Sequence, residues 1–167
     1  MPKAAQGLTD TAEHPCDGDL YEVDEHAWVA AQVAALKHGY LDRLDRGHLI
    51  EYLTAMTIRD RRGLRSRLTV LLYHLLKIRL QPDGLTRSWV MIVIEQQSEI
   101  RGIIEGIPSL GRQAEGIAAA AYPDAVRRAA RETGIPATRF PATSPWTLQE
   151  ALAFDPPEPA ARGKRPA

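Results

Sequence analysis

Apolar residues recur at intervals of three and four along most of the chain, which is the spacing of a helix that buries one side. The first such segment begins at Asp19 and ends at Gly39. Asp19 and Glu22 have the spacing of two residues that cap the start of a helix. The pattern predicts one helix over the whole segment. Its buried side would hold Leu20, Val23, Ala27, Trp28, Ala31 and Ala35.

A second helical pattern begins at Asp45, a residue suited to capping a helix, and continues to Leu80. One unbroken helix of this extent would be ~54 Å long. A compact chain of this size has a radius of gyration of only ~15 Å. We therefore predict a break or bend between Thr57 and Gly63. The apolar positions of the first part are Leu49, Leu53 and Met56.

The second part, from Leu64 onward, is apolar on almost every side, because Val70 and Tyr73 lie opposite a broad face of leucines. A helix of this kind is normally enclosed by its neighbours, so we expect it at the centre of a bundle. His74 and Lys77 are embedded in it, and the spacing directs Lys77 away from the leucines. The leucine face consists of Leu64, Leu68, Leu71, Leu72, Leu75 and Leu76.

The next helix is predicted from Trp89 to Ile107. Its first six residues, WVMIVI, have the composition of a strand, but the helical spacing lasts about five turns. Pro108 would end this helix, and Ser109 would cap an alanine-rich helix that ends at Thr133-Gly134. Pro123 inside that helix lacks a backbone donor, which predicts a kink or a restart.

The proline-punctuated residues 135–146 predict an extended strap packed through Phe140 and Trp146, and Thr147 with Glu150 predicts a capping box for a short final helix. The predicted fold is therefore an all-α bundle of four to five main helices with a C-terminal extended strap and a short terminal helix. We expect one domain over 19–154. Residues 1–18 and 155–167 lack an apolar pattern and are predicted to be a disordered lead and tail.

Composition narrows the class of protein. The 167 residues are 44% hydrophobic and 25% charged, as in ordinary globular proteins, and 21 basic residues balance 21 acidic ones. No stretch has the length of a signal peptide or a membrane span, so we expect a cytoplasmic protein with no membrane contact. The single Cys16 excludes an internal disulfide and agrees with a reducing compartment.

Several motifs resemble those of one bacterial family, catalogued as domain of unknown function twenty-nine. They are LYEVDEHAW, LRSRLTVLLYHLLK followed by QP, RSW, EQ, IPSL, AY, ARETG and FPATSPWTL, and they extend in order from Leu20 to Phe154. The resemblance implies an all-helical fold and no assigned activity. The chain departs from the family pattern at His48, Glu51 and Tyr52, where an Asn and two Glu are usual, at Ile78, usually aromatic, and at Thr57, usually Gly.

The arginine run Arg59–Arg67 contains five arginines in nine positions and one counter-charge, Asp60. Arg61, Arg62 and Arg65 are candidate binding residues, because arginines can neutralise phosphates. The structural alternative is a solvated helix flank paired with carboxylates elsewhere. No aromatic residues interleave with the run, so a base-stacking platform is not indicated, and nucleic-acid binding is the lesser alternative.

Gln96 falls between Val93 and Ile100 in an apolar stripe, where a buried amide needs hydrogen-bond partners. If it faces His74 across the two central helices, the two side chains could line a small polar pocket. Further members would be His48, Glu51, Arg87 and Trp89. The alternative, which we favour, is a polar network that gives the bundle its specificity.

Other chemistry has less support. His48 and Glu51 share a helix face, but helical metal sites need several such pairs, so we predict no metal and no cofactor. Ser109 lacks the strand-turn-helix setting of a nucleophile and is better explained as a cap.

The sequence therefore favours a non-enzymatic cytoplasmic binding or interaction protein with a protein partner. The alternative is an enzyme that acts on an anionic substrate, with His74, Glu95 and Gln96 as candidate catalytic residues and Lys77 or Arg87 beside them. The alanine-rich helices also allow pairing between copies of the chain.

Overall fold

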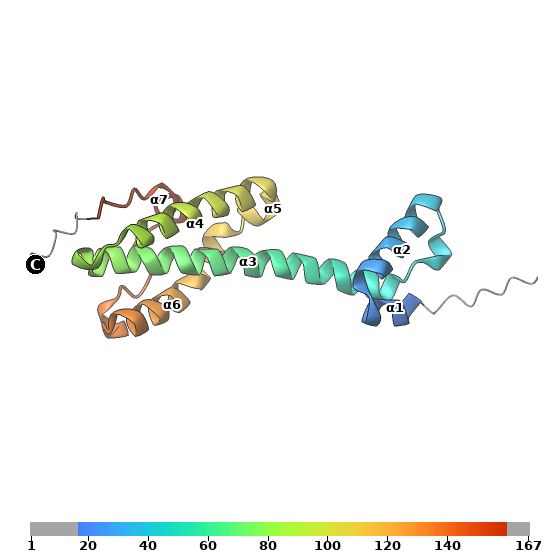
Figure 1. Ribbon diagram of the computed structural model, residues 1–167, viewed down its shortest axis with the longest axis horizontal. Coiled ribbons are helices and arrows are strands. Elements are labelled where there is room, and N and C mark those ends of the chain that lie inside the picture. Colours follow the sequence, from blue (N-terminus) through green and yellow to red (C-terminus); the bar gives the residue numbers. More distant parts are fainter. Residues whose placement is uncertain (1–16, 160–167) are drawn as a thin grey trace, which may run out of the picture. The chain divides into compact units, whose positions relative to one another are not determined.

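A computed structural model describes residues 17–159, and every regular element within that range is a helix, which confirms the all-α class (Figure 1). The chain forms two compact units, Met1–Thr57 and Ile58–Ala167, called here the N-terminal unit and the C-terminal unit. Most of the predicted lead, including Cys16, lies outside the described residues. The end of the predicted tail, from residue 160, also lies outside them. The extent of the predicted domain stays a prediction.

The N-terminal unit contains α1 (Asp17–Val23), α2 (Glu25–His38), the short 3-10 helix η1 (Leu41–Arg43) and the beginning of α3 (Arg46–Leu80). The single helix predicted from Asp19 to Gly39 is therefore wrong. It is divided at Asp24, whose carboxylate accepts a hydrogen bond from the Ala27 amide at 3.0 Å and caps α2. The predicted end is confirmed, since Gly39 adopts φ 73° and closes α2.

The core of the N-terminal unit is small. Trp28, Gln32 and Ala35 are buried, whereas Val23, predicted to be buried, is 85% exposed. The error follows from the break at Asp24, because the helical spacing of α1 does not continue into α2.

The helix α3 is continuous from Arg46 to Leu80, so the predicted break between Thr57 and Gly63 is wrong. The prediction assumed one compact body, whereas the boundary between the two units lies within α3, after Thr57. Thr57 is accommodated in the helix, where its hydroxyl donates to the Thr54 carbonyl at 2.8 Å.

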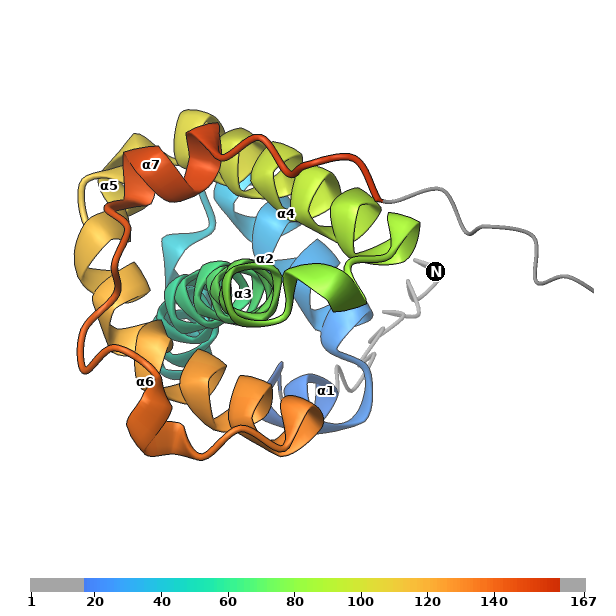
Figure 2. The same ribbon diagram turned by 90° about the vertical axis from the view of Figure 1, so that its left-hand side faces the viewer.

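The C-terminal unit is built around α3, as the leucine pattern predicts, and all eight residues 71–78 are buried. The helices α4 (Arg87–Gly106) and α6 (Ala114–Thr133) lie on opposite sides of it (Figures 1 and 2). The remaining elements are η2 (Pro82–Gly84), α5 (Pro108–Gly111), η3 (Ala137–Arg139) and α7 (Leu148–Ala153). The buried side chains of α3, α4 and α6 form one apolar cluster, which is the core of this unit.

Local signals decide where these helices begin and end. The run WVMIVI is helical, as its spacing predicts, and Thr86 caps α4. Thr147 and Glu150 form the predicted capping box of α7. Ser109 is not a cap, because α5 already begins at Pro108 and Ser109 lies inside it. The helix α6 contains Pro123 without an interruption, so the predicted restart there is wrong.

The segment between α6 and α7 contacts the core through Phe140, which is buried, and Trp146, which is half-buried. The Tyr122 hydroxyl of α6 donates to the Pro141 carbonyl at 2.9 Å, which ties the segment to that helix. None of the helices in the described part of the chain is long and apolar enough to cross a membrane.

Candidate functional site

A row of polar side chains runs between α3 and α6 in the C-terminal unit. The α3 members recur every three or four residues, with Arg65 and Ser66 adjacent, and the α6 members recur every four, so each set occupies one face of its helix. We call this row the α3–α6 seam. It consists of Arg62, Arg65, Ser66, Thr69, Tyr73 and Lys77 from α3 and Asp124, Arg128 and Glu132 from α6.

At one end of the seam, Lys77 is buried, with only 2% of its surface exposed. Its Nζ atom forms an ion pair with Glu132, donates to the Tyr73 hydroxyl at 3.3 Å, and lies 3.7 Å from the centre of the Trp89 ring. Burial lowers the pKa of Lys77, and the nearby Arg128 guanidinium lowers it further. The helical spacing directs Lys77 away from the leucines but does not predict this enclosure.

His74 is buried near Lys77, and one of its two ring nitrogens is bonded within its own helix. Its Nδ1 atom donates to the Val70 carbonyl at 2.9 Å, and its ring meets the Tyr73 ring edge to face at 4.3 Å. Burial lowers the pKa of His74, and the charges of Lys77 and Arg128 act in the same direction. Burial therefore favours the neutral form of the ring, in which Nδ1 carries the proton donated to the Val70 carbonyl.

The buried amide of α4 is Gln97 rather than the predicted Gln96, which is only partly buried. The Nε2 atom of Gln97 donates to the Ala151 carbonyl at 3.0 Å and to the Phe154 carbonyl at 2.7 Å. Gln97 therefore holds α7 on α4 instead of facing His74. Gln96 is therefore not the buried amide on which the predicted His74–Gln96 pocket depended.

At the other end of the seam, the arginine run borders an open groove of about 310 Å³. Its lining includes Arg62 and Arg65 but not Arg61, which donates to the Gln113 side chain at 2.7 Å. Arg65 pairs with Asp124 at 2.8 Å and also donates to the Ala120 carbonyl at 3.4 Å, in the turn of α6 before Pro123. The structure thus brings together two of the three predicted arginines.

The other predicted site residues are dispersed. Arg87 and Glu95 are exposed on α4, while Trp89 of the same helix covers Lys77. What the sequence reasoning missed is the contribution of α6, whose members Asp124, Arg128 and Glu132 follow a four-residue spacing. That spacing is the signal that could have identified them.

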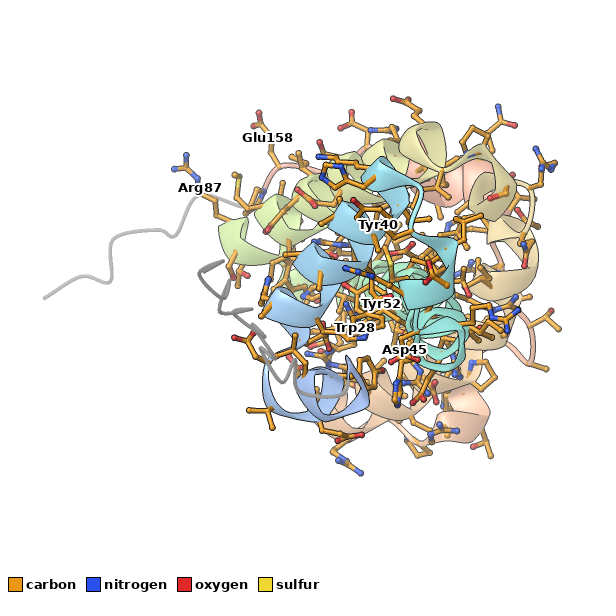
Figure 3. The ribbon with its side chains drawn as sticks, turned by 90° about the vertical axis from the view of Figure 1, so that its right-hand side faces the viewer. Trp28, Tyr40, Asp45, Tyr52, Arg87 and Glu158 are labelled. Atoms are coloured by element: carbon orange, nitrogen blue, oxygen red, sulfur yellow. The ribbon has the colours of Figure 1, made fainter. Side chains whose placement is uncertain are left out.

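The N-terminal unit contains an aromatic cluster around one carboxylate (Figure 3). The Trp28 indole donates to Asp45 at 3.3 Å, and the Nδ1 atom of His48 lies 2.6 Å from the same carboxylate oxygen. The hydrogen bond from His48 lowers the pKa of Asp45, and Asp45 raises the pKa of His48. Tyr21 stacks on His48 at 4.3 Å, and the Tyr52 ring lies 5.5 Å from the Trp28 ring.

In this cluster the Nδ1 atom of His48 bonds Asp45, and Glu51 is exposed. Within residues 17–159, no three histidine, cysteine or acidic side chains come together in a way that could hold a metal ion.

A second hollow, of about 370 Å³, lies between α6 and residues 142–147 of the C-terminal unit. Its two carboxylates are already engaged. Glu115 accepts from the Leu148 amide at 2.9 Å, and Glu150 accepts from the Thr147 amide at 2.8 Å. The acidic groups of this hollow therefore fix the start of α7.

The family described as "Domain of unknown function DUF29" matches residues 20–155, so the chain belongs to this family and the resemblance noted in the sequence is confirmed. The match spans the described parts of both compact units almost completely. No curated protein and no solved structure shows significant similarity to the chain. The family description assigns no activity, so function has to be argued from the site itself.

Proposed function

We propose that the protein is a non-enzymatic interaction protein of the bacterial cytoplasm, whose N-terminal unit binds a basic amphipathic helix of a protein partner. The observation that carries this proposal is a set of exposed apolar side chains on a unit with a negative net charge. The N-terminal unit presents what such a helix needs, an apolar surface and an excess of carboxylates.

The polar groups inside the C-terminal unit support a non-enzymatic role. His74, Lys77 and Gln97 are all buried, and each has a partner inside the protein. A general acid or base has to reach a substrate proton within hydrogen-bond distance. His74, the central residue of the enzyme hypothesis, is only 5% exposed, so its ring offers little surface to a substrate.

The apolar side chains of the N-terminal unit are exposed on two helices and the segment that joins them. On α3, Ile50, Leu53 and Met56 follow a spacing of three, so they share one side of the helix. Ile50 is 68% exposed and Leu53 is 57% exposed, although solvent-facing positions of a helix are usually polar. We call these three residues of α3 the apolar face. Further exposed apolar residues of the unit are Val33 and Leu36 on α2 and Tyr40 and Leu41 in the segment that follows it.

The charge of the unit determines which kind of partner fits this face. Residues 17–57 contain three basic and eight acidic residues, and three minus eight gives a net charge of −5 with histidines neutral. A charge of this sign attracts basic segments and disfavours acidic ones. The complementary partner is a helix with leucine-like residues on one side and lysine or arginine on the other.

Binding of a defined peptide tests the proposal. The probe is a fluorescently labelled amphipathic peptide of leucine and lysine, titrated into the full chain and compared with a scrambled peptide of the same composition. We expect the amphipathic peptide to bind at least about tenfold more tightly. Ile50→Gln and Leu53→Gln should each weaken binding by about tenfold, because a buried leucine-sized side chain contributes about 1.5–3 kcal/mol.

Met91→Gln is the matched control, because Met91 is a similarly exposed apolar residue on α4 of the C-terminal unit. Its effect should stay below about twofold. Equal binding of the scrambled peptide, or equal weakening by Met91→Gln, would overturn the proposal. Analytical ultracentrifugation separates peptide binding from self-association. A wild-type dimer that Leu53→Gln converts to a monomer would overturn the proposal and assign the apolar face to a second copy of the chain.

A further inference from the structure

We propose that the groove between α3 and α6 binds a phosphate group, either as inorganic phosphate or as a monoester carried by a small molecule. The site lies entirely within the C-terminal unit, so it is independent of the apolar face. The groove has a volume of about 310 Å³ and is lined by Arg62, Arg65, Ser66, Thr69, Asp124 and Arg128.

The charges of the lining favour a dianion. Three arginines face one carboxylate, so the lining has a net charge of +2. Asp124 already pairs with both Arg65 and Arg127, so its carboxylate does not also pair with the other arginines of the groove. Among the described residues, neither Arg62 nor Arg128 forms an ion pair. Two guanidinium groups are therefore available for one ligand, and their planar forks suit phosphate oxygens.

Two of the three arginines of the groove, Arg65 and Arg128, are also held in position before any ligand arrives. Arg128 packs over the Tyr73 ring with its guanidinium carbon 4.7 Å from the ring centre. Arg65 is fixed by Asp124 and the Ala120 carbonyl. Arg62 and Ser66 are one helical turn apart on α3, so a guanidinium and a hydroxyl donor face the same space. Binding to side chains that are already ordered costs less conformational entropy.

The size and lining of the groove favour a small phosphorylated molecule over a nucleic-acid strand. Small-molecule sites begin at a volume of about 300 Å³. No aromatic side chain lines the groove, whereas proteins that bind single strands stack bases on aromatic rings. Two further arginines of the run are directed elsewhere, since Arg61 bonds Gln113 and Arg67 pairs with Glu99 at 3.1 Å.

The experiment is a calorimetric titration of the full chain with inorganic phosphate and, separately, with phenyl phosphate, in a phosphate-free buffer of low ionic strength. We expect saturable binding of at least one probe. Arg62→Gln and Arg128→Gln should each raise the dissociation constant by about tenfold or more, the usual scale for a lost charge-assisted hydrogen bond. Tighter binding of phenyl phosphate would identify a monoester as the ligand, and tighter binding of inorganic phosphate would identify the free anion.

Arg67→Gln is the matched control, because Arg67 belongs to the same run but lies outside the groove lining. It should change the affinity for either probe by less than about twofold. Arg62 is exposed, so the Arg62→Gln result does not depend on the stability of the fold. Absence of saturable binding at millimolar phosphate would overturn the proposal. So would a single-stranded oligonucleotide that binds and is weakened equally by Arg62→Gln and Arg67→Gln, since the run would then be a polyanion surface.

Discussion

The Nζ atom of Lys77 lies 3.7 Å from the centre of the Trp89 ring, so a buried ammonium group of α3 rests on an aromatic face from α4. The same atom is paired with Glu132 of α6. A desolvated cation–π contact is worth about 2 kcal/mol, but removing the ammonium from water costs several kcal/mol. Lys77 therefore determines how three helices fit together more than it adds to net stability.

Substitutions can separate the stabilising contacts of the Lys77 ammonium from the cost of burying it. Glu132→Gln leaves the buried ammonium without its carboxylate and should lower the free energy of unfolding by about 1–2 kcal/mol, at the low end because Glu132 is half exposed. Lys77→Met removes the charge but keeps a long flexible side chain, so it should change the free energy of unfolding by less than about 1 kcal/mol. Urea unfolding at neutral pH measures both values.

Glu99→Gln is the control for this comparison, because it breaks the exposed pair with Arg67 on another face of α3. Its effect should not exceed about 0.5 kcal/mol. A larger loss for Lys77→Met than for Glu132→Gln would mean that the ammonium contributes net stability, contrary to this account.

Gln97 is the second buried polar group whose role can be measured. Gln97→Met retains the volume but leaves the Ala151 and Phe154 carbonyls without their donor, so we expect a loss of about 1–3 kcal/mol. Limited proteolysis should cleave the variant first near α7, because Gln97 holds that helix on α4. The neighbouring Gln96→Met should change neither stability nor cleavage by a comparable amount. Equal effects of the two substitutions would show that the amide has no special role.

The Gln96 error shows where sequence reasoning stops. Steps of three and of four residues both fit a helix, so Val93 is compatible with a following buried position at 96 or at 97. The observed choice depends on carbonyl groups in α7, more than fifty residues later in the chain. Local signals do not contain that information, whereas they did locate Gly39, the leucine face of α3 and the Thr147–Glu150 capping box.

The lack of long-range information in local patterns also explains why the groove and the unbroken length of α3 were not predicted. The arginine run is visible in the sequence, but the partners that distinguish Arg61 and Arg67 from Arg62 come from the turn between α5 and α6 and from α4. The break predicted near Thr57 depended on a global assumption of one compact body. No local residue demanded it, since Gly63 is compatible with a helix at a cost of about 1 kcal/mol.

Asp45 joins α3 to the aromatic cluster of the N-terminal unit. It accepts from the His48 amide at 3.2 Å as the cap of α3 and from the Trp28 indole, while its own amide donates to Gln32 at 2.8 Å. Asp45→Ala should destabilise this unit by about 1–2 kcal/mol through the lost cap. Asp45→Asn keeps an acceptor and should cost less. Thermal unfolding followed by near-ultraviolet circular dichroism, to which Trp28 contributes, measures the change in stability. Equal losses of stability for the two variants would contradict the capping role.

The two histidines should give opposite responses to acid. The hydrogen bond to Asp45 raises the pKa of His48 above its ordinary value of 6.5, so its stabilising contribution is fully present below pH 6.5 and is lost as the pH rises through the folded-state pKa. Burial lowers the pKa of His74 below 6.5. The unfolded chain then binds a proton at His74 before the folded chain does, so acidification from pH 7 destabilises the C-terminal unit.

Melting temperatures at mildly acidic and mildly alkaline pH test this prediction in the wild type, His48→Gln and His74→Gln. Relative to the wild type, His74→Gln should lose less stability on acidification, because the group that opposes folding in acid has been removed. His48→Gln should lose more, because the protonated His48–Asp45 pair no longer forms. Identical pH profiles for the wild type and His74→Gln would show that His74 accepts a proton as readily in the folded protein as in the unfolded chain. That outcome would contradict the lowered pKa that burial gives to His74.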